Sequence, residues 1–282
     1  MDRLPVRRSL AGKAETPDPA SASRRDAKGS GVLNLTLPLV ITLAAVFTTA
    51  MADTSIDSPR FGAPGMLEPH TGSLLVDYYE AFLRDQDIES FQQHVSARYT
   101  EGTLARLIES GNPQARRAAV LSLGLFGTYE VNAAVARALR DTDLTVRRLA
   151  GDALWAIWFR ADTPENNKTL EQVSQLIGHQ RLEQAVELAT RLLERSPRFA
   201  EAYNQRAIAH FAQEHFEESA ADCRRVLEHN PYHFGALSGL AQCQLRLGQR
   251  REALKTFRRA LRLQPYNDGL REAVDALEAE GE

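Results

Sequence analysis

Apolar residues recur at helical spacing from Ser73 to the C-terminal end of the chain, and no strand-like alternation interrupts them. One such stripe is made by Leu270, Ala273, Val274 and Leu277. Before Ser73 the pattern changes, because residues 53–72 are rich in Pro, Gly and Ser and have no periodicity. The pattern therefore predicts an all-α fold over residues 73–282, preceded by a flexible linker.

Three prolines divide the second half of the chain at a fixed interval. Pro197, Pro231 and Pro265 are 34 residues apart and close similar phrases, "ATRLLERSP", "CRRVLEHNP" and "FRRALRLQP". When the segments are aligned on these prolines, small residues fall at corresponding positions. Ala207 and Ala241 correspond to each other in the first helix of a unit, and Ala185, Ser219 and Ala253 correspond in the second helix. Antiparallel helices approach closely only where small side chains face each other, and proline stops a helix before the next unit. Here the chain resembles the tetratricopeptide repeat (TPR) family.

The TPR resemblance implies an α-solenoid of three helix pairs. The expected units are residues 166–199, 200–233 and 234–267, and a capping helix follows at 268–280. Asn267 or Asp268 is its expected N-cap. A TPR domain is thus expected over residues 163–282.

The first half has a repeat of its own. The segments "GNPQARRAAVLSLGLFG" and "TDLTVRRLAGDALWAIW" align without gaps at a spacing of 31 residues, which superposes Arg116 on Arg147. This pattern resembles the HEAT-like repeat family, and residues 73–162 are expected to form such repeats. The segment from Leu74 to Tyr99 is expected to be a degenerate first unit.

Residues 1–52 have the pattern of a targeting segment. Residues 1–31 carry seven Arg or Lys and four Asp or Glu, residues 32–52 carry no charge, and the run ends in Ala50-Met51-Ala52. This arrangement favours a cleaved export signal, and an uncleaved membrane anchor or a misplaced start is left open. We expect the bulk of the chain to be exported to the periplasm or cell envelope, by either route.

Nucleotide-binding and catalytic motifs are absent from the sequence, which has no G-x-x-x-x-G-K-[ST], no H-E-x-x-H, no C-x-x-C and no G-x-S-x-G. His229 and His233 flank Pro231 at an inter-repeat turn, so they do not share one helical face, and no metal site is expected there. If His233 has a function, it is as a contact at the rim of the groove. We expect no enzymatic activity and no cofactor.

The two cysteines are expected on neighbouring helices. Cys223 falls on the second helix of the middle unit and Cys243 on the first helix of the last unit. A disulfide between them and a pair of small buried thiols are both left open.

The TPR resemblance also implies a concave groove, lined by the first helix of each unit, that binds extended or helical peptides. The positions carried over are Leu170, Ser174, Ile177, Asn204, Ile208, Phe211, Ser238, Gln242 and Leu245. Family members that clamp a peptide carboxylate use Lys, Asn and Arg, whereas Gln205, Gly235 and Gly239 occupy three of those places here. A carboxylate clamp is therefore not expected.

These observations predict a non-enzymatic scaffold or adaptor that binds a protein or peptide partner in the TPR groove. The net charge of −3 indicates no global attraction to nucleic acid. Two alternatives are left open, an accessory or assembly factor for a cofactor-bearing enzyme and an envelope organiser that forms homo-oligomers.

Overall fold

The structure is a computed structural model that describes residues 73–279, and these residues form helices and no strand. The predicted export segment and linker lie outside the described residues. None of the helices in the described part is long and apolar enough to cross a bilayer. The helices are α2 (Leu74–Asp85), α3 (Ile88–Ser96), α4 (Glu101–Leu107), α5 (Pro113–Phe126), η1 (Tyr129–Val131), α6 (Asn132–Ala138), α7 (Leu144–Phe159), α8 (Pro164–Gly178), α9 (Leu182–Arg195), α10 (Ala200–Ala212), α11 (Phe216–His229), α12 (Phe234–Arg246), α13 (Arg250–Leu263) and α14 (Asp268–Ala279).

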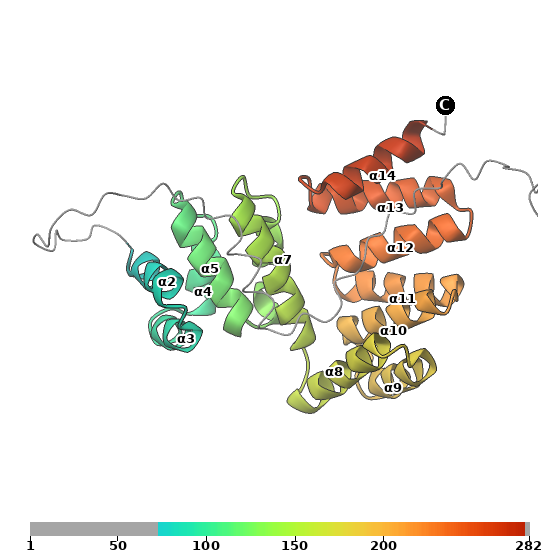
Figure 1. The fold of residues 1–282 in the computed structure, drawn as a ribbon, viewed down its shortest axis with the longest axis horizontal. Coiled ribbons are helices and arrows are strands. Elements are labelled where there is room, and N and C mark those ends of the chain that lie inside the picture. Colours follow the sequence, from blue (N-terminus) through green and yellow to red (C-terminus); the bar gives the residue numbers. More distant parts are fainter. Residues whose placement is uncertain (1–72, 280–282) are drawn as a thin grey trace, which may run out of the picture. The chain divides into compact units, whose positions relative to one another are not determined.

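Helices α2 to α7 form three antiparallel hairpins, α2–α3, α4–α5 and α6–α7, which correspond to the expected HEAT-like units. The first hairpin packs through α2 on α5, and α5 packs on α7 (Figure 1). Side-chain caps fix where several of these helices begin, because they satisfy backbone N–H groups that have no partner within the helix. Asn112 caps α5 and is followed by Pro113 at the first helical position, and Asp143 caps α7.

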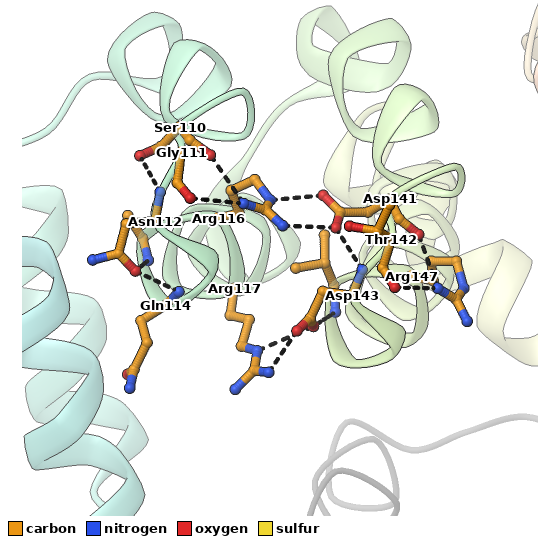
Figure 2. Close-up of polar contacts among 12 residues, drawn as sticks. Ser110, Gly111, Asn112, Gln114, Arg116, Arg117, Asp141, Thr142, Asp143 and Arg147 are labelled. Carbon is orange, nitrogen blue, oxygen red and sulfur yellow. Dashed lines mark hydrogen bonds and ion pairs between the residues drawn. The ribbon is translucent and has the colours of Figure 1, made fainter.

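The 31-residue repeat corresponds to a repeated contact in the structure. Arg116 Nη1 donates to the carbonyl oxygen of Ser110 at 3.0 Å, and Arg147 Nη1 donates to the carbonyl oxygen of Asp141 at 2.8 Å (Figure 2). Each arginine therefore stands in the first turn of its long helix and binds the turn that precedes that helix. The sequence repeat is thus a repeat of local geometry.

Ion pairs join the second repeat to the third. Arg116 binds both carboxylate oxygens of Asp141, at 2.7 and 2.9 Å, and Arg117 binds both of Asp143 (Figure 2). Asp143 also accepts the Val146 N–H as the cap of α7. The hydrogen bond from the Arg117 guanidinium holds the pKa of Asp143 below its ordinary value. Paired and partly buried, these charges order the two repeats relative to each other.

Helices α8 to α13 form three further hairpins, α8–α9, α10–α11 and α12–α13, and α14 packs on α13 (Figure 1). The small residues predicted at the helix crossings are all buried: Ala185, Ala207, Ser219, Ala241 and Ala253. The predicted capping helix is α14, and Asn267 is its cap, because its side-chain oxygen accepts the Leu270 N–H at 3.1 Å.

The turn inside each of these hairpins has the same backbone shape. Gln180, Glu214 and Gly248 are again 34 residues apart, and all three have positive φ, at 57°, 62° and 72°. This left-handed conformation costs a non-glycine residue about 1–2 kcal/mol, so packing of the helices on either side holds Gln180 and Glu214 there.

Candidate functional site

The first helices of the three units are neighbours in space. Helix α10 contacts both α8 and α12, so their outward residues contribute to one surface. This is the surface on which the sequence places the peptide-binding groove.

The nine predicted groove residues differ in accessibility. Four are buried by the protein itself and offer no surface to a partner: Leu170, Ser174, Ile177 and Asn204. The other five are partly exposed and lie on α10 and α12: Ile208, Phe211, Ser238, Gln242 and Leu245. We call these five residues the α10–α12 face. The prediction that a partner binds in the groove depends on this face.

A buried polar cluster explains why Asn204 is inaccessible. The carboxylate of Glu201 accepts hydrogen bonds from Asn204 Nδ2 at 2.9 Å and from Gln205 Nε2 at 2.8 Å. Its second oxygen lies 2.9 Å from His233 Nε2, and neither Glu201 nor His233 has an exposed side chain. Because His233 Nδ1 accepts the Ala236 N–H, Nε2 carries the proton and donates to Glu201. The expectation that His233 lies at the groove rim is therefore wrong.

The cover over this cluster comes from the HEAT-like half. The Trp158 ring of α7 stacks on the His233 ring, with centroids 4.0 Å apart and planes inclined by 20°. Trp158 Nε1 donates to Asn132 Oδ1 at 2.8 Å, and Asn132 Nδ2 donates to Asn230 Oδ1 at 3.0 Å. A continuous buried network thus connects the two kinds of repeat. Neither Asn132 nor Glu201 was singled out from the sequence.

A second tryptophan of α7 covers the beginning of α12. A Cβ atom added to Gly235 would lie 2.8 Å from Cη2 of Trp155, so the close approach of that ring requires glycine. A Cβ atom added to Gly239 would lie 3.3 Å from Cys223 Sγ, a tight contact that a small shift of the thiol could relieve. Two of the three places where a carboxylate clamp would need polar side chains are therefore glycines, which have no side chain to bind a carboxylate. The amide of the third, Gln205, is bound to Glu201.

The HEAT-like half contacts the turn that precedes each new TPR helix. These inter-repeat turns are residues 196–199, 230–233 and 264–267. The Ser196 hydroxyl donates to Asp162 at the first turn, the Trp158–His233 stack lies at the second, and the Arg147 guanidinium lies 4.2 Å from the Tyr266 ring centroid at the third. The contacts therefore repeat with the period of the TPR units.

The two cysteines lie in one buried apolar cluster and are free thiols in the structure. Cys243 Sγ donates to Ser219 Oγ at 3.2 Å. Burial raises the pKa of both thiols, which keeps them protonated and unreactive. The disulfide between Cys223 and Cys243 stays a prediction. Within residues 73–279, no group of three or more His, Cys, Asp or Glu side chains is placed to hold a metal ion.

Paired helices, repeated contacts and a shared surface define the class: the described part of the chain is a helical-repeat protein. The family comparisons name the repeats. A HEAT repeat model matches residues 100–194, and two tetratricopeptide repeat models match residues 170–234 and 210–277. The chain therefore contains HEAT and tetratricopeptide repeats, as the sequence predicts. The HEAT match extends over α8 and α9, so the domain boundary at residue 163 stays a prediction.

Individual relatives match over part of the chain. A TPR repeat-containing protein of Rhizobium etli is 28% identical over 120 residues, which are 43% of this chain and 59% of the relative. Among solved structures, the Sgt2 TPR domain from Aspergillus fumigatus is 19% identical with a TM-score of 0.40, covering 43% of this chain and 81% of that domain. The TPR2AB domain of yeast Sti1, solved as a pHSP90 complex, is 18% identical with a TM-score of 0.38, covering 72% of this chain and 97% of that one.

Proposed function

We propose that the chain is a non-enzymatic scaffold that binds a peptide segment of a partner protein on the α10–α12 face. The observation that carries this proposal is the accessibility of Ile208, Phe211 and Leu245, apolar side chains that stay partly exposed on two neighbouring first helices. When a partner covers partly exposed apolar side chains, the complex is stabilised by about 25 cal/mol for each Å² of apolar surface removed from water. The polar Ser238 and Gln242 between them supply hydrogen bonds that fix orientation.

The test uses crosslinking in intact cells followed by identification of the attached proteins. Gln242→Arg introduces a long charged side chain at a partly exposed position with no hydrogen bond within residues 73–279, so the fold is expected to persist. Ile208→Glu places a charge on the apolar part of the same face. Loss of the same crosslinked partner from both variants supports the proposal.

The matched control is Leu144→Glu, a similar change at a side chain that is 43% exposed at the start of α7, outside the face. This variant is expected to retain the partner. Wild-type crosslinking by Gln242→Arg and Ile208→Glu, with helical content unchanged by circular dichroism, would show that the face binds no partner.

We also propose that the helical repeats act outside the cytoplasm. The supporting observation is in the sequence, where an uncharged run at 32–52 follows an Arg-containing head and ends in Ala-Met-Ala. N-terminal sequencing of the protein from fractionated cells is expected to begin at Asp53 in a periplasmic fraction, or to find the full N-terminus in the membrane fraction. Intact protein in the cytoplasmic fraction would contradict both routes.

A further inference from the structure

Helix α12 carries an arginine at the edge of the α10–α12 face. Arg246 follows Leu245 directly and stands four residues after Gln242, and both of these residues belong to the face. Residues four apart on a helix are neighbours on one side of it. Arg246 therefore lies at the end of the row of α12 side chains that make the face.

Arg246 is also the exposed charge of the two helices that form this face. Helices α10 and α12, both described in full, contain no Asp or Lys, one Glu and two Arg. Glu201 is buried, and Arg206 is bound to the two carboxylate oxygens of Asp222 on α11 at 2.8 and 2.7 Å. Burial lowers the pKa of His210, which favours its uncharged form. The accessible charge on the two helices is therefore positive and belongs to Arg246.

An aromatic pair holds the Arg246 guanidinium next to the face. The guanidinium carbon lies 4.7 Å from the centroid of the Phe216 ring. That ring in turn packs edge to face against Phe211, a residue of the face, with the centroids 5.3 Å apart. A cation–π contact uses the flat side of a guanidinium and leaves the N–H groups at its edge free to donate.

The hydrogen-bonding capacity of Arg246 is unused in the described part of the chain. Its ion-pair partner there is Glu214, whose Oε1 lies 3.8 Å from Nη2, too far for a hydrogen bond. The two side chains are 49% and 77% exposed, so water screens this pair and its contribution is small. The N–H groups of Arg246 are therefore available to a carboxylate that comes from a partner.

We propose that Arg246 is a specificity-determining residue of the α10–α12 face and binds the carboxylate of an Asp or Glu side chain in the partner peptide. This inference rests on the proposed function and narrows the partner to a peptide with an acidic residue beside apolar ones. The apolar residues of the peptide cover Ile208, Phe211 and Leu245. Its carboxylate accepts two parallel N–H···O bonds at the edge of the guanidinium, an arrangement that gives geometric specificity as well as affinity.

The structure favours an acidic side chain over the C-terminal carboxylate of a peptide. Arg246 stands outside the three places of the carboxylate clamp, and two of these carry Gly235 and Gly239. The amide of Gln205, at the third place, is bound to Glu201. No second polar side chain at these places is therefore free to hold a chain terminus together with Arg246.

The first experiment selects binders from a displayed library of random peptides with the purified full-length chain. The baits are the wild type, Arg246→Gln, the groove variant Ile208→Glu and the control Arg225→Gln. Arg225 is a matched control because its side chain is 48% exposed and paired with Glu228 on α11, outside the face. Wild-type and Arg225→Gln selections are expected to enrich Asp or Glu at one position among apolar residues, and Arg246→Gln selections are expected to lose this preference. Peptides bound through the face are not selected by Ile208→Glu.

A selected acidic peptide, synthesised with an amidated C-terminus, then serves as the probe in a binding titration. Arg246→Gln is expected to weaken its binding about fivefold, the upper range for an exposed ion pair. A probe with Gln in place of its acidic residue is expected to bind the wild type and Arg246→Gln equally. Glu214→Gln is expected to strengthen binding of the acidic probe about twofold, because it removes the carboxylate that competes for Arg246. Damage to the fold would not produce such a gain.

The outcomes separate this inference from the function on which it rests. Peptides that are lost with Ile208→Glu, but whose acidic preference is absent or is unchanged by Arg246→Gln, would overturn the role of Arg246 and leave the groove standing. A free C-terminal carboxylate that restores the affinity of the Gln-containing probe would overturn the choice of an acidic side chain. If no selected peptide is sensitive to Ile208→Glu, both the groove and the role of Arg246 are refuted.

Discussion

Replacing Trp158 by Phe removes one hydrogen bond from the junction between the HEAT and TPR repeats while keeping an aromatic ring over His233. Trp158 is 1% exposed, and its indole Nε1–H donates a hydrogen bond to Asn132 Oδ1. A buried acceptor left without a donor costs about 1–3 kcal/mol. The smaller ring also leaves a cavity, which costs about 1 kcal/mol more. The expected loss in the free energy of unfolding is therefore about 2–4 kcal/mol.

Trp155→Phe is the matched control, because Trp155 lies on the same helix, is partly exposed and has no hydrogen bond to its indole in the described part of the chain. Its expected cost is below about 1 kcal/mol. Urea denaturation followed by far-UV circular dichroism measures both, since fluorescence would change with the loss of either tryptophan. With an m-value of about 3 kcal/mol/M, Trp158→Phe lowers the midpoint by about 1 M. Equal midpoints for the two variants would refute the reasoning that the buried network joins the repeats.

Two further predictions concern charges. Arg116→Gln removes the bidentate partner of Asp141, whose side chain is only 11% exposed, and is expected to lower the free energy of unfolding by about 2–4 kcal/mol. Its control, Arg137→Gln, breaks the exposed pair with Glu109 and is expected to cost below about 1 kcal/mol. Similar urea midpoints for the two variants would contradict this. Asp152→Asn is expected to stabilise the protein by about 1–3 kcal/mol at pH 8 and by almost nothing near pH 4. The reason is that a carboxyl group whose pKa is raised from 3.8 to about 6 by folding lowers the stability of the wild type as pH rises between these two values. A gain in stability that does not change with pH would contradict this.

Periodicity made the fold predictable from the sequence. The 34-residue spacing of Pro197, Pro231 and Pro265 places each inter-repeat turn, and Asn267 caps the last helix as its side chain suggests. The 31-residue spacing of Arg116 and Arg147 likewise corresponds to a repeated contact. Such features were predictable because each repeat unit contacts mainly its neighbours in the chain.

The candidate site was less predictable, because it depends on contacts between elements far apart in the chain. Asn204 and Leu170 occupy positions that line a groove when nothing else packs there. Here the fully buried Glu201 binds Asn204, and Phe159 from α7 packs at the cluster of Leu170. The spacing within a unit carries no information about the approach of α7, so the role of His233 could not be inferred from its neighbours in the sequence.

The contacts of the HEAT-like half at all three inter-repeat turns have a mechanical consequence. An array of repeats that contact only their neighbours bends like a spring, since small changes at each interface add along the array. Here Asp162, Trp158 and Arg147 brace three successive turns from one side, so they oppose changes in the angle between units. The α10–α12 face therefore keeps its curvature before any partner arrives. Under the proposed function, a partner whose shape matches this face is expected to bind without the entropic cost of straightening or closing the array, and a partner of another shape is expected to bind more weakly.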